Sequence, residues 1–243
     1  MLLCNTQGNS AKEDYYFKIA SQNKVDGIIC VSYQDTESYI SENIPIISLD
    51  RHFEKNISCI CSDNYHGGEI AAQKMISTGS RNLIYIRSGS TIPGETMKRE
   101  YGFSDYCKSK GVHCDSLNLG DESETTEERI LKYEKKIYDF IADNIKSGKF
   151  LYDGIYVSTD WLALIILEQM KKFGIKVPEE TQVIGHDGLR QVNQKVYLLS
   201  TIVQPVKEMA EKSVELILKK IKGEEIDLLT MLPVEFADGG TTR

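Results

Sequence analysis

Polar side chains stand in this sequence at the points where short apolar, strand-like runs end. They comprise carboxylates, amides, hydroxyls and two arginines: Asn5, Ser32, Asp50, Arg51, Asp63, Asn64, Arg87, Thr159, Asp160 and Asp187. Ligands of open parallel sheets bind beyond the carboxyl ends of the strands. Carboxylates, amides and a guanidinium that converge there can hold neighbouring hydroxyls of a polyol through paired hydrogen bonds. Each of these residues taken alone also fits a cap or a turn, because Asp and Asn are favoured at strand-to-helix junctions.

Signatures of catalysis and of cofactor or metal binding are missing from the sequence. It contains no G-x-G-x-x-G motif after a strand, no G-x-S-x-G motif and no H-E-x-x-H motif. Most of the six cysteines lie in apolar runs, and His66 and His113 lack the spacing of zinc ligands. We therefore expect buried or half-buried thiols in a reducing cytoplasm, no cofactor, no metal and no enzymatic activity.

Composition and charge narrow the class of protein further. The chain has 243 residues, of which 41% are hydrophobic and 27% charged, as in an ordinary globular protein. Its net charge of −7 argues against this chain itself binding a nucleic-acid backbone, which requires clustered Lys and Arg. The longest apolar run, residues 161–167, is too short to span a bilayer, and no secretory signal follows Met1. These features predict a cytoplasmic protein without a membrane segment.

Short β-rich runs alternate with longer helical patterns along the whole chain. The predicted strands are residues 2–4, 27–31, 45–49, 57–61, 83–86, 117–119, 154–157, 182–184, 201–203 and 232–236. The predicted helices are residues 14–23, 65–78, 95–110, 126–146, 161–173 and 205–222. This alternation predicts an α/β fold of parallel sheets with helices on both faces. About ten strands exceed what one sheet usually carries, so two α/β lobes are expected.

Short motifs spread over nearly the whole chain match one known pattern in order and spacing. They are IPIISLDR (44–51), CSDNYHGG (61–68), REYGF (99–103), DGIYVSTDWLA (153–163), GIKVP (174–178), VIGHD (183–187), LSTIVQP (199–205), and LP (232–233) with TT (241–242). Together they resemble the effector-binding domain of the LacI/GalR family of bacterial transcription regulators.

The resemblance implies the type I periplasmic-binding-protein fold, in which two Rossmann-like, doubly wound parallel-sheet lobes are joined by crossover segments. The N-terminal lobe would comprise residues 1–80 and 204–223, and the C-terminal lobe residues 81–203 and 224–243. Members of the family bind an effector in the cleft between the lobes. That effector is usually a sugar, a sugar phosphate or a nucleobase.

Six effector-binding residues follow from the resemblance by position. They are Ser32 and Asp63 on the wall of the first lobe, Arg99, Thr159 and Asp187 on the second, and Trp161 as a stacking face. Arg99 is the foremost of them, because an arginine fork can hold adjacent hydroxyls or a phosphate. Trp161 is a candidate because Glu122 stands where the family has its stacking aromatic, although a tryptophan at the start of an apolar helix also fits the core. His186 replaces the aromatic that usually precedes Asp187, which leaves the class of effector open.

The resemblance also indicates what the chain lacks. Family members carry an N-terminal helix-turn-helix head that reads DNA, and no such segment is present. The first core strand and helix are missing as well, because residues 1–6 align with the second strand. We therefore expect an incomplete N-terminal lobe and a chain that is a fragment or begins at an internal Met. A stop codon in frame directly upstream of Met1 would contradict this hypothesis.

The expected function is that of the effector-binding and dimerisation region of a LacI-type regulator or repressor. A small sugar-like effector would close the cleft and so alter the spacing of paired DNA-binding heads. The expected partners are this effector, a second copy of the chain, and operator DNA bound through the missing head.

Two alternatives stay open. A solute-binding protein of a sugar transport system would need a signal peptide or lipoprotein cysteine, and an α/β hydrolase would need a nucleophile or metal cluster at a strand end.

Overall fold

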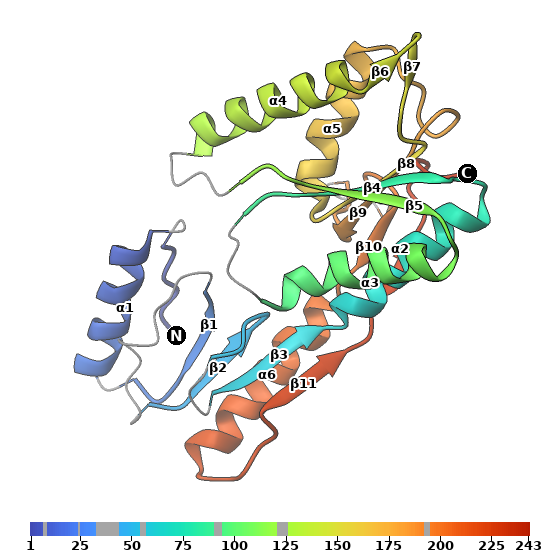
Figure 1. Cartoon of the computed structure of the whole chain (residues 1–243). Helices are drawn as coiled ribbons and strands as arrows, with labels where there is room; N and C mark the ends of the chain where they lie inside the picture. Colours follow the sequence, from blue (N-terminus) through green and yellow to red (C-terminus); the bar gives the residue numbers. More distant parts are fainter. Residues whose placement is uncertain are drawn as a thin grey trace. The chain divides into compact units, whose positions relative to one another are not determined.

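The computed structural model describes residues 1–6, 9–23, 25–32, 44–53, 57–89, 94–120, 126–191 and 195–243. Its contacts divide the chain into two compact units. Unit 1 comprises Met1–Ser62 and Pro205–Pro233, and unit 2 comprises Asp63–Gln204 and Val234–Arg243. Both units are built on parallel strands with helices against them, so the predicted α/β class is confirmed (Figure 1). Within the described residues, no helix is both long and apolar enough to cross a membrane.

Unit 1 contains a parallel sheet of four strands in the order β1-β2-β3-β11. The strands are β1 (Ile28–Val31), β2 (Ile46–Leu49), β3 (Ser58–Ser62) and β11 (Leu229–Leu232), and each pair of neighbours is parallel. Helix α6 (Val206–Ile221) buries Leu216 and Ile217 against Ile47 and Ile60 on one face of the sheet. Phe17 of helix α1 (Ser10–Gln22) packs with Ile46, Phe53 and Ile57 in a second cluster. Side chains that alternate along β2 therefore enter two different cores.

The edge of this sheet differs from the prediction. Residues 2–4 do not form a strand, and Leu2 and Leu3 are exposed. A strand needs a hydrogen-bonded neighbour, and no described strand pairs with these residues. Strand β1 accordingly lies at the end of the strand order, with the side chains of Ile29 and Val31 exposed.

Unit 2 contains a sheet of six strands in the order β12-β10-β9-β8-β4-β5. The strands are β4 (Asn82–Arg87), β5 (His113–Asn118), β8 (Gly154–Val157), β9 (Gln182–Asp187), β10 (Thr201–Val203) and β12 (Glu235–Ala237), and β12 alone among them is antiparallel to its neighbour. Alternate residues of β4 face opposite sides, since Ile84 and Ile86 join one core and Leu83 and Tyr85 the other.

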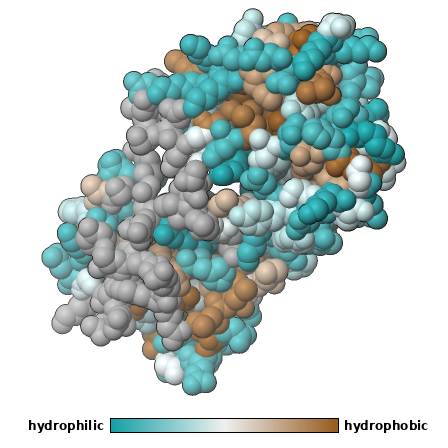
Figure 2. Space-filling model, viewed as in Figure 1, coloured by the Kyte–Doolittle hydropathy of each residue, from teal (hydrophilic) through white to brown (hydrophobic). Residues whose placement is uncertain are grey.

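Helices cover both faces of this sheet (Figure 1). Helices α4 (Thr126–Asp143) and α5 (Asp160–Lys172) pack on one face. Helices α2 (Asn64–Ser77) and α3 (Lys98–Ser109) pack on the other. Helix α4 buries Tyr133, Ile137 and Ile141 at a spacing of four residues, which places one apolar stripe against the sheet. Figure 2 shows hydrophilic side chains over its outer surface and apolar ones beneath it.

Several predicted boundaries change in the structure. The predicted strand 232–236 is two strands, β11 in unit 1 and β12 in unit 2, separated by Pro233, which has no N–H for a strand ladder. The predicted helix 126–146 ends at Asp143 and is followed by a short hairpin of β6 (Ile145–Lys146) and β7 (Lys149–Phe150). The predicted helix 95–110 begins with a 3-10 turn, Glu95–Met97, before α3.

The first boundary between the units lies at residues 62 and 63, whereas the sequence predicted it near residue 80. Helix α2 therefore groups with unit 2. The reason is its close packing on α3, because a Cβ atom on Gly68 would overlap the backbone of Arg99, and one on Gly102 would overlap the backbone of Tyr65. The later boundaries lie between residues 204 and 205 and between residues 233 and 234. They enclose the segment Pro205–Pro233, which contains α6 and β11.

Candidate functional site

Arg99 is a buried cation at the carboxyl edge of the unit 2 sheet. It is the second residue of α3 and only 3% of it is exposed. Its Nε atom donates a hydrogen bond to Oδ1 of Asn64 at 2.7 Å, and its Nη1 atom donates to the carbonyl oxygen of Ser158 at 2.6 Å. These two bonds join α3 to the start of α2 and to the end of β8. They hold the guanidinium plane in one orientation, which is what recognition by an arginine fork requires.

Asp187 lies beside this guanidinium at the end of β9. Its Oδ1 atom is 3.9 Å from Arg99 Nη1 and accepts a hydrogen bond from Nε2 of Gln204 at 2.7 Å. Burial raises the pKa of Asp187 to about 6, although Arg99 and Gln204 favour its charged form. About 31% of its side chain remains exposed. The carboxylate therefore has a cation and an amide donor beside it and is still accessible from solvent.

The backbone at Asp187 is held in an uncommon conformation. Its φ angle is +129°, a region that a residue with a Cβ atom rarely adopts. Such a conformation persists only where neighbouring groups fix it, and it concentrates at functional sites. Here Asp160 fixes it, because its carboxylate binds the backbone of Gly188 and Leu189, the two residues after Asp187.

Asp160 is fully buried and accepts three hydrogen bonds. Its Oδ2 atom accepts from the backbone N–H groups of Gly188 at 2.8 Å and Leu189 at 2.7 Å, and its Oδ1 atom accepts from the hydroxyl of Thr201 at 2.7 Å. Burial raises its pKa, and these three bonds oppose the shift. Asp160 is thus a structural clamp that positions the end of β9.

A glycine makes room for this clamp. A Cβ atom on Gly185 would overlap the carboxylate of Asp160, which explains the glycine in the VIGHD motif.

Thr159, and not its neighbour Asp160, caps helix α5. The Thr159 hydroxyl accepts a hydrogen bond from the N–H of Leu162 at 3.3 Å, and its backbone is extended, as the residue before a helix requires. Asp63 has the same role for α2, where its Oδ1 atom accepts from the N–H of His66 at 3.0 Å. Both predicted site residues therefore lie at helix starts and spend one acceptor on a cap.

A buried layer lies behind the Arg99 group. The Tyr156 hydroxyl is 2.7 Å from Nδ1 of His186, and both side chains are fully buried. Desolvation lowers the pKa of His186 to well below its ordinary value, so the ring is neutral. Tyr156 also makes tilted ring contacts with Tyr85 and Phe103 at centroid separations of 5.2 and 5.1 Å. This layer gives the polar residues a rigid, apolar floor.

Two predicted site residues are not among the described contacts of Arg99 and Asp187. The described ring contact of Trp161 is an edge-on approach to Tyr133 of α4, at 6.2 Å between centroids, and 39% of the tryptophan is exposed. Ser32 belongs to unit 1 and is buried directly after β1. The structure of unit 2 thus brings Arg99 and Asp187 together and does not add Trp161 to them.

Sequence reasoning did not assign three of the contributors to the group. Gln204 directly follows β10, so the rule of polar residues after strands could have identified it. Asn64 stood among the polar strand-end residues, but nothing in the sequence indicated Arg99 as its partner. Ser158 contributes a backbone carbonyl oxygen, for which no side-chain signal exists.

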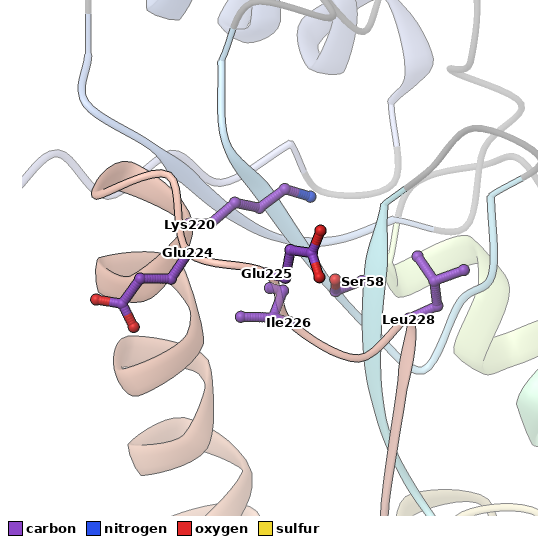
Figure 3. A pocket seen from close by; sticks show the side chains of 6 residues that line it. All are labelled: Ser58, Lys220, Glu224, Glu225, Ile226 and Leu228. Atoms are coloured by element: carbon purple, nitrogen blue, oxygen red, sulfur yellow. The ribbon is translucent and has the colours of Figure 1, made fainter.

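A surface pocket in unit 1 lies at the opposite, amino-terminal end of its strands (Figure 3). Its lining comes from the end of α6, the loop that follows and the first residue of β3: Ser58, Lys220, Glu224, Glu225, Ile226 and Leu228. Desolvation lowers the pKa of Lys220, whose Nζ atom donates to the carbonyl oxygen of Ile46 at 3.4 Å. Charges of both signs line this pocket, and ligands of parallel sheets bind at the other end, so it is not the candidate site.

The chemistry of the Arg99 group suits hydroxyl recognition. A guanidinium, a carboxylate and two amides offer donors and acceptors for adjacent hydroxyls. Across the residues that the structure describes, no group of three or more His, Cys, Asp or Glu side chains could hold a metal ion.

Comparisons with known proteins agree with this architecture. Residues 72–242 match the family described as periplasmic binding protein-like domain. The chain is 32% identical over 239 residues to the sucrose operon repressor of Streptococcus mutans, covering 98% of this chain and 70% of the repressor. It is 28% identical over 245 residues to the ribose operon repressor of Bacillus subtilis, covering 100% of this chain and 71% of that repressor.

A solved structure is similar over the whole chain. It is a periplasmic binding protein/LacI transcriptional regulator from Alkaliphilus metalliredigens in complex with D-xylulofuranose, with a TM-score of 0.81 and 28% identity, covering 100% of this chain and 87% of that one. The resemblance found in the motifs is therefore confirmed. The chain belongs to the LacI/GalR family of transcription regulators and carries its periplasmic binding protein-like domain.

Proposed function

We propose that the chain senses a small, sugar-like polyol through Arg99 and Asp187, and that this binding controls transcription by the regulator to which it belongs. The observation that carries the proposal is the buried, oriented guanidinium of Arg99 beside a partly exposed carboxylate at the carboxyl edge of a parallel sheet. A buried charge is retained at a cost in folding energy, so a role in recognition accounts for it better than stability does.

The spacing of the pair suits a hydroxyl ligand. Arg99 spends two of its five N–H donors on Asn64 and Ser158, and its Nη1 atom stands 3.9 Å from Asp187. This separation is longer than a charge-assisted hydrogen bond, which is about 2.7–2.9 Å. A sugar hydroxyl can form hydrogen bonds with both side chains at once, because it accepts one from an arginine N–H and donates one to the carboxylate.

Relatives support sugars as the class of ligand and regulation as the purpose. The sucrose and ribose operon repressors are named for sugar operons, and the similar regulator from Alkaliphilus metalliredigens was solved with a sugar. The names of these relatives also favour regulation over the alternative of a solute-binding protein in a transport system, and binding over enzymatic turnover.

Further parts of the proposal rest on the family. We propose that the regulator acts in the cytoplasm as a homodimer and reads operator DNA through a helix-turn-helix head. Ser32, Asp63, Thr159 and Trp161 remain candidates for additional ligand contacts. The hydroxyl of Thr159 can still donate while its oxygen caps α5, so it is the foremost of these four.

Thermal shift measurements with sucrose, fructose, ribose and xylulose test the proposal on the chain itself. At least one sugar should raise the melting temperature of the wild type and of Lys171→Ala, an exposed control near the end of α5. The same sugar should leave Asp187→Ala unshifted. If no sugar shifts the wild type, or if Asp187→Ala responds as fully as the control, the proposed site is wrong.

Transcript levels distinguish a regulator from a transport component. Deleting the gene for this protein should release expression of neighbouring sugar genes when the sugar is absent. Unchanged transcripts with a loss of sugar uptake would instead support the transport alternative.

A further inference from the structure

A second arginine at the carboxyl edge of the unit 2 sheet is not used by the proposed site. Arg87 is the last residue of β4, and only 13% of its side chain is exposed. Its Nε atom lies 3.2 Å from Oε2 of Glu100 in α3. The other oxygen of this carboxylate, Oε1, accepts a hydrogen bond from the hydroxyl of Ser116 in β5 at 2.5 Å. Glu100 therefore forms an ion pair with Arg87 and is itself held in place from a neighbouring strand.

This ion pair is adjacent to the Arg99 group along the backbone. Glu100 directly follows Arg99 in α3. Arg99 donates to the carbonyl oxygen of Ser158, and the N–H of Ser158 donates to the carbonyl oxygen of Ile86 at 2.9 Å. Ile86 directly precedes Arg87. Two short chains of contacts, one through α3 and one through the strand ends, thus connect the two arginines.

The two guanidinium groups also lie on one face of the sheet. Side chains alternate along β4, so Arg87 lies on the same side as Tyr85, which packs in the core with α2 and α3. Arg99 comes from α3 itself. Burial raises the pKa of Tyr85, and the charges of Arg99, Glu100 and Arg87 act on it as well, as expected when all three lie close to one side chain.

Each of these guanidinium groups already faces a carboxylate. Arg99 lies 3.9 Å from Asp187, and Arg87 lies 3.2 Å from Glu100. Asp160 adds a third carboxylate, whose described hydrogen bonds come from uncharged groups. The two arginines are therefore balanced in charge before any ligand binds.

This balance distinguishes between two kinds of sugar ligand. The hydroxyl groups of a free sugar carry no charge, and they exchange hydrogen bonds with both members of an ion pair. A phosphate ester carries a charge of about −1.5 to −2 at neutral pH, so it requires a cation of its own. Carboxylates that already neutralise the arginines repel such a ligand.

We propose that the unit 2 site selects uncharged sugars against their phosphate esters, and that Glu100 enforces this selection by holding Arg87. The inference rests on the proposed function of Arg99 and Asp187. Glu100 touches no ligand in this account. It withholds a second cation from the site, which is a device against the wrong ligand and adds no contact to the right one.

Isothermal titration of the wild type with matched ligand pairs tests the selection. The probes are sucrose, fructose, ribose and xylulose, each free and phosphorylated on a primary hydroxyl, at mildly alkaline pH where Asp187 is charged. The sugar that binds best should bind about 100-fold more tightly than its ester.

The outcomes separate this inference from the proposed function. An ester that binds within about tenfold of its free sugar, or more tightly, overturns the selection. If Asp187→Ala then abolishes binding of that ester, the proposed function stands without the selection. If neither form of any sugar binds, the proposed function fails and the selection fails with it.

Matched variants test the role of Glu100. Glu100→Gln keeps the length of the side chain and an acceptor for Ser116 but removes the charge that neutralises Arg87, so the preference for the free sugar should shrink about tenfold. Adding Arg87→Gln should restore the preference, because the cation that attracts the phosphate is gone. Glu168→Gln makes the same change of net charge on the exposed surface of α5 and should keep the wild-type preference.

An unchanged preference in a folded Glu100→Gln variant, or an equal change in Glu168→Gln, would overturn the role of Glu100. A measurement on the wild type covers the case in which Glu100→Gln does not fold. In about 1 M salt the Debye length falls to about 3 Å, so the preference should shrink while the affinity for the free sugar changes little. A preference that is independent of salt would show that the ester is excluded by its size, which contradicts selection by charge.

Discussion

Replacing Asp160 by alanine should strongly destabilise unit 2 and disturb the ligand site without touching a ligand. The fully buried carboxylate accepts hydrogen bonds from two backbone N–H groups and from the hydroxyl of Thr201. Alanine removes all three bonds. It leaves the N–H group of Leu189 without its acceptor and the N–H group of Gly188 with only the Thr201 hydroxyl, at 3.2 Å.

The magnitude follows from these bonds and from the cost of the buried charge. A hydrogen bond to a charged group contributes about 1.5–3 kcal/mol, so three give roughly 5–9 kcal/mol before any cost is subtracted. Burial raises the pKa of Asp160, which means that the bonds do not fully offset desolvation. Losing a partner in such a buried charged network costs about 3–5 kcal/mol, and we expect Asp160→Ala to fall in this range.

The conservative variant sharpens the test. In Asp160→Asn the amide oxygen can still accept from Gly188 and Leu189, while the amide NH₂ donates to the oxygen of Thr201. The variant keeps the bonds and loses the costly charge, so we expect it to cost about 1 kcal/mol or less.

Urea unfolding followed by tryptophan fluorescence measures both changes. Trp161 is the single tryptophan of the chain and lies in α5 of unit 2, so its emission reports this unit and not unit 1. Equal losses for alanine and asparagine would show that the negative charge, and not the pattern of acceptors, holds the end of β9. A loss below about 1 kcal/mol for alanine would refute the clamp altogether.

Three other predictions follow from the same contacts. Because burial raises the pKa of Asp187 to about 6, affinity for the sugar should fall as the pH drops through 6. The stability of the ligand-free protein should rise over the same range, since the folded state holds that proton more tightly than the unfolded chain. Asp187→Asn should abolish both trends, the first in calorimetric titrations and the second in urea unfolding curves. Gly68→Ala should cost about 1–3 kcal/mol or more in the same urea assay, because its Cβ atom would overlap the backbone of α3, whereas Ala substitution of the exposed Lys171 should cost little. His186→Phe should cost about 1–3 kcal/mol by stranding the buried Tyr156 hydroxyl, and adding Tyr156→Phe should recover part of that loss; full additivity would rule out the coupling.

The fold class could be predicted from the sequence because alternation of strand and helix patterns is a local signal that tertiary packing rarely reverses. Strand pairing is not local in this way. Residues 2–4 are apolar enough for a strand, yet they form none, because no described strand pairs with them. Residues 232–236 read as one strand, although Pro233 lies where the chain passes from unit 1 to unit 2.

The candidate site could be predicted in part. Arg99 and Asp187 came from motifs, and the structure places them 3.9 Å apart. The burial of Arg99 could not be predicted, because it depends on α2 packing so closely on α3 that Asn64 reaches the guanidinium. The division of roles between Thr159 and Asp160 was equally hidden, since adjacent polar residues at a helix start offer the same pattern. Their backbone geometry decides which one caps the helix.

The central claim is that the Arg99 fork and Asp187 together hold a sugar. Isothermal titration of the best-binding sugar into the wild type, Arg99→Lys and Lys171→Ala tests it most directly. Lysine keeps the charge and loses the fork, so affinity should fall about 10–100-fold, which corresponds to roughly 1.4–2.8 kcal/mol, while Lys171→Ala should bind as the wild type does. Wild-type affinity in a folded Arg99→Lys variant would contradict the claim.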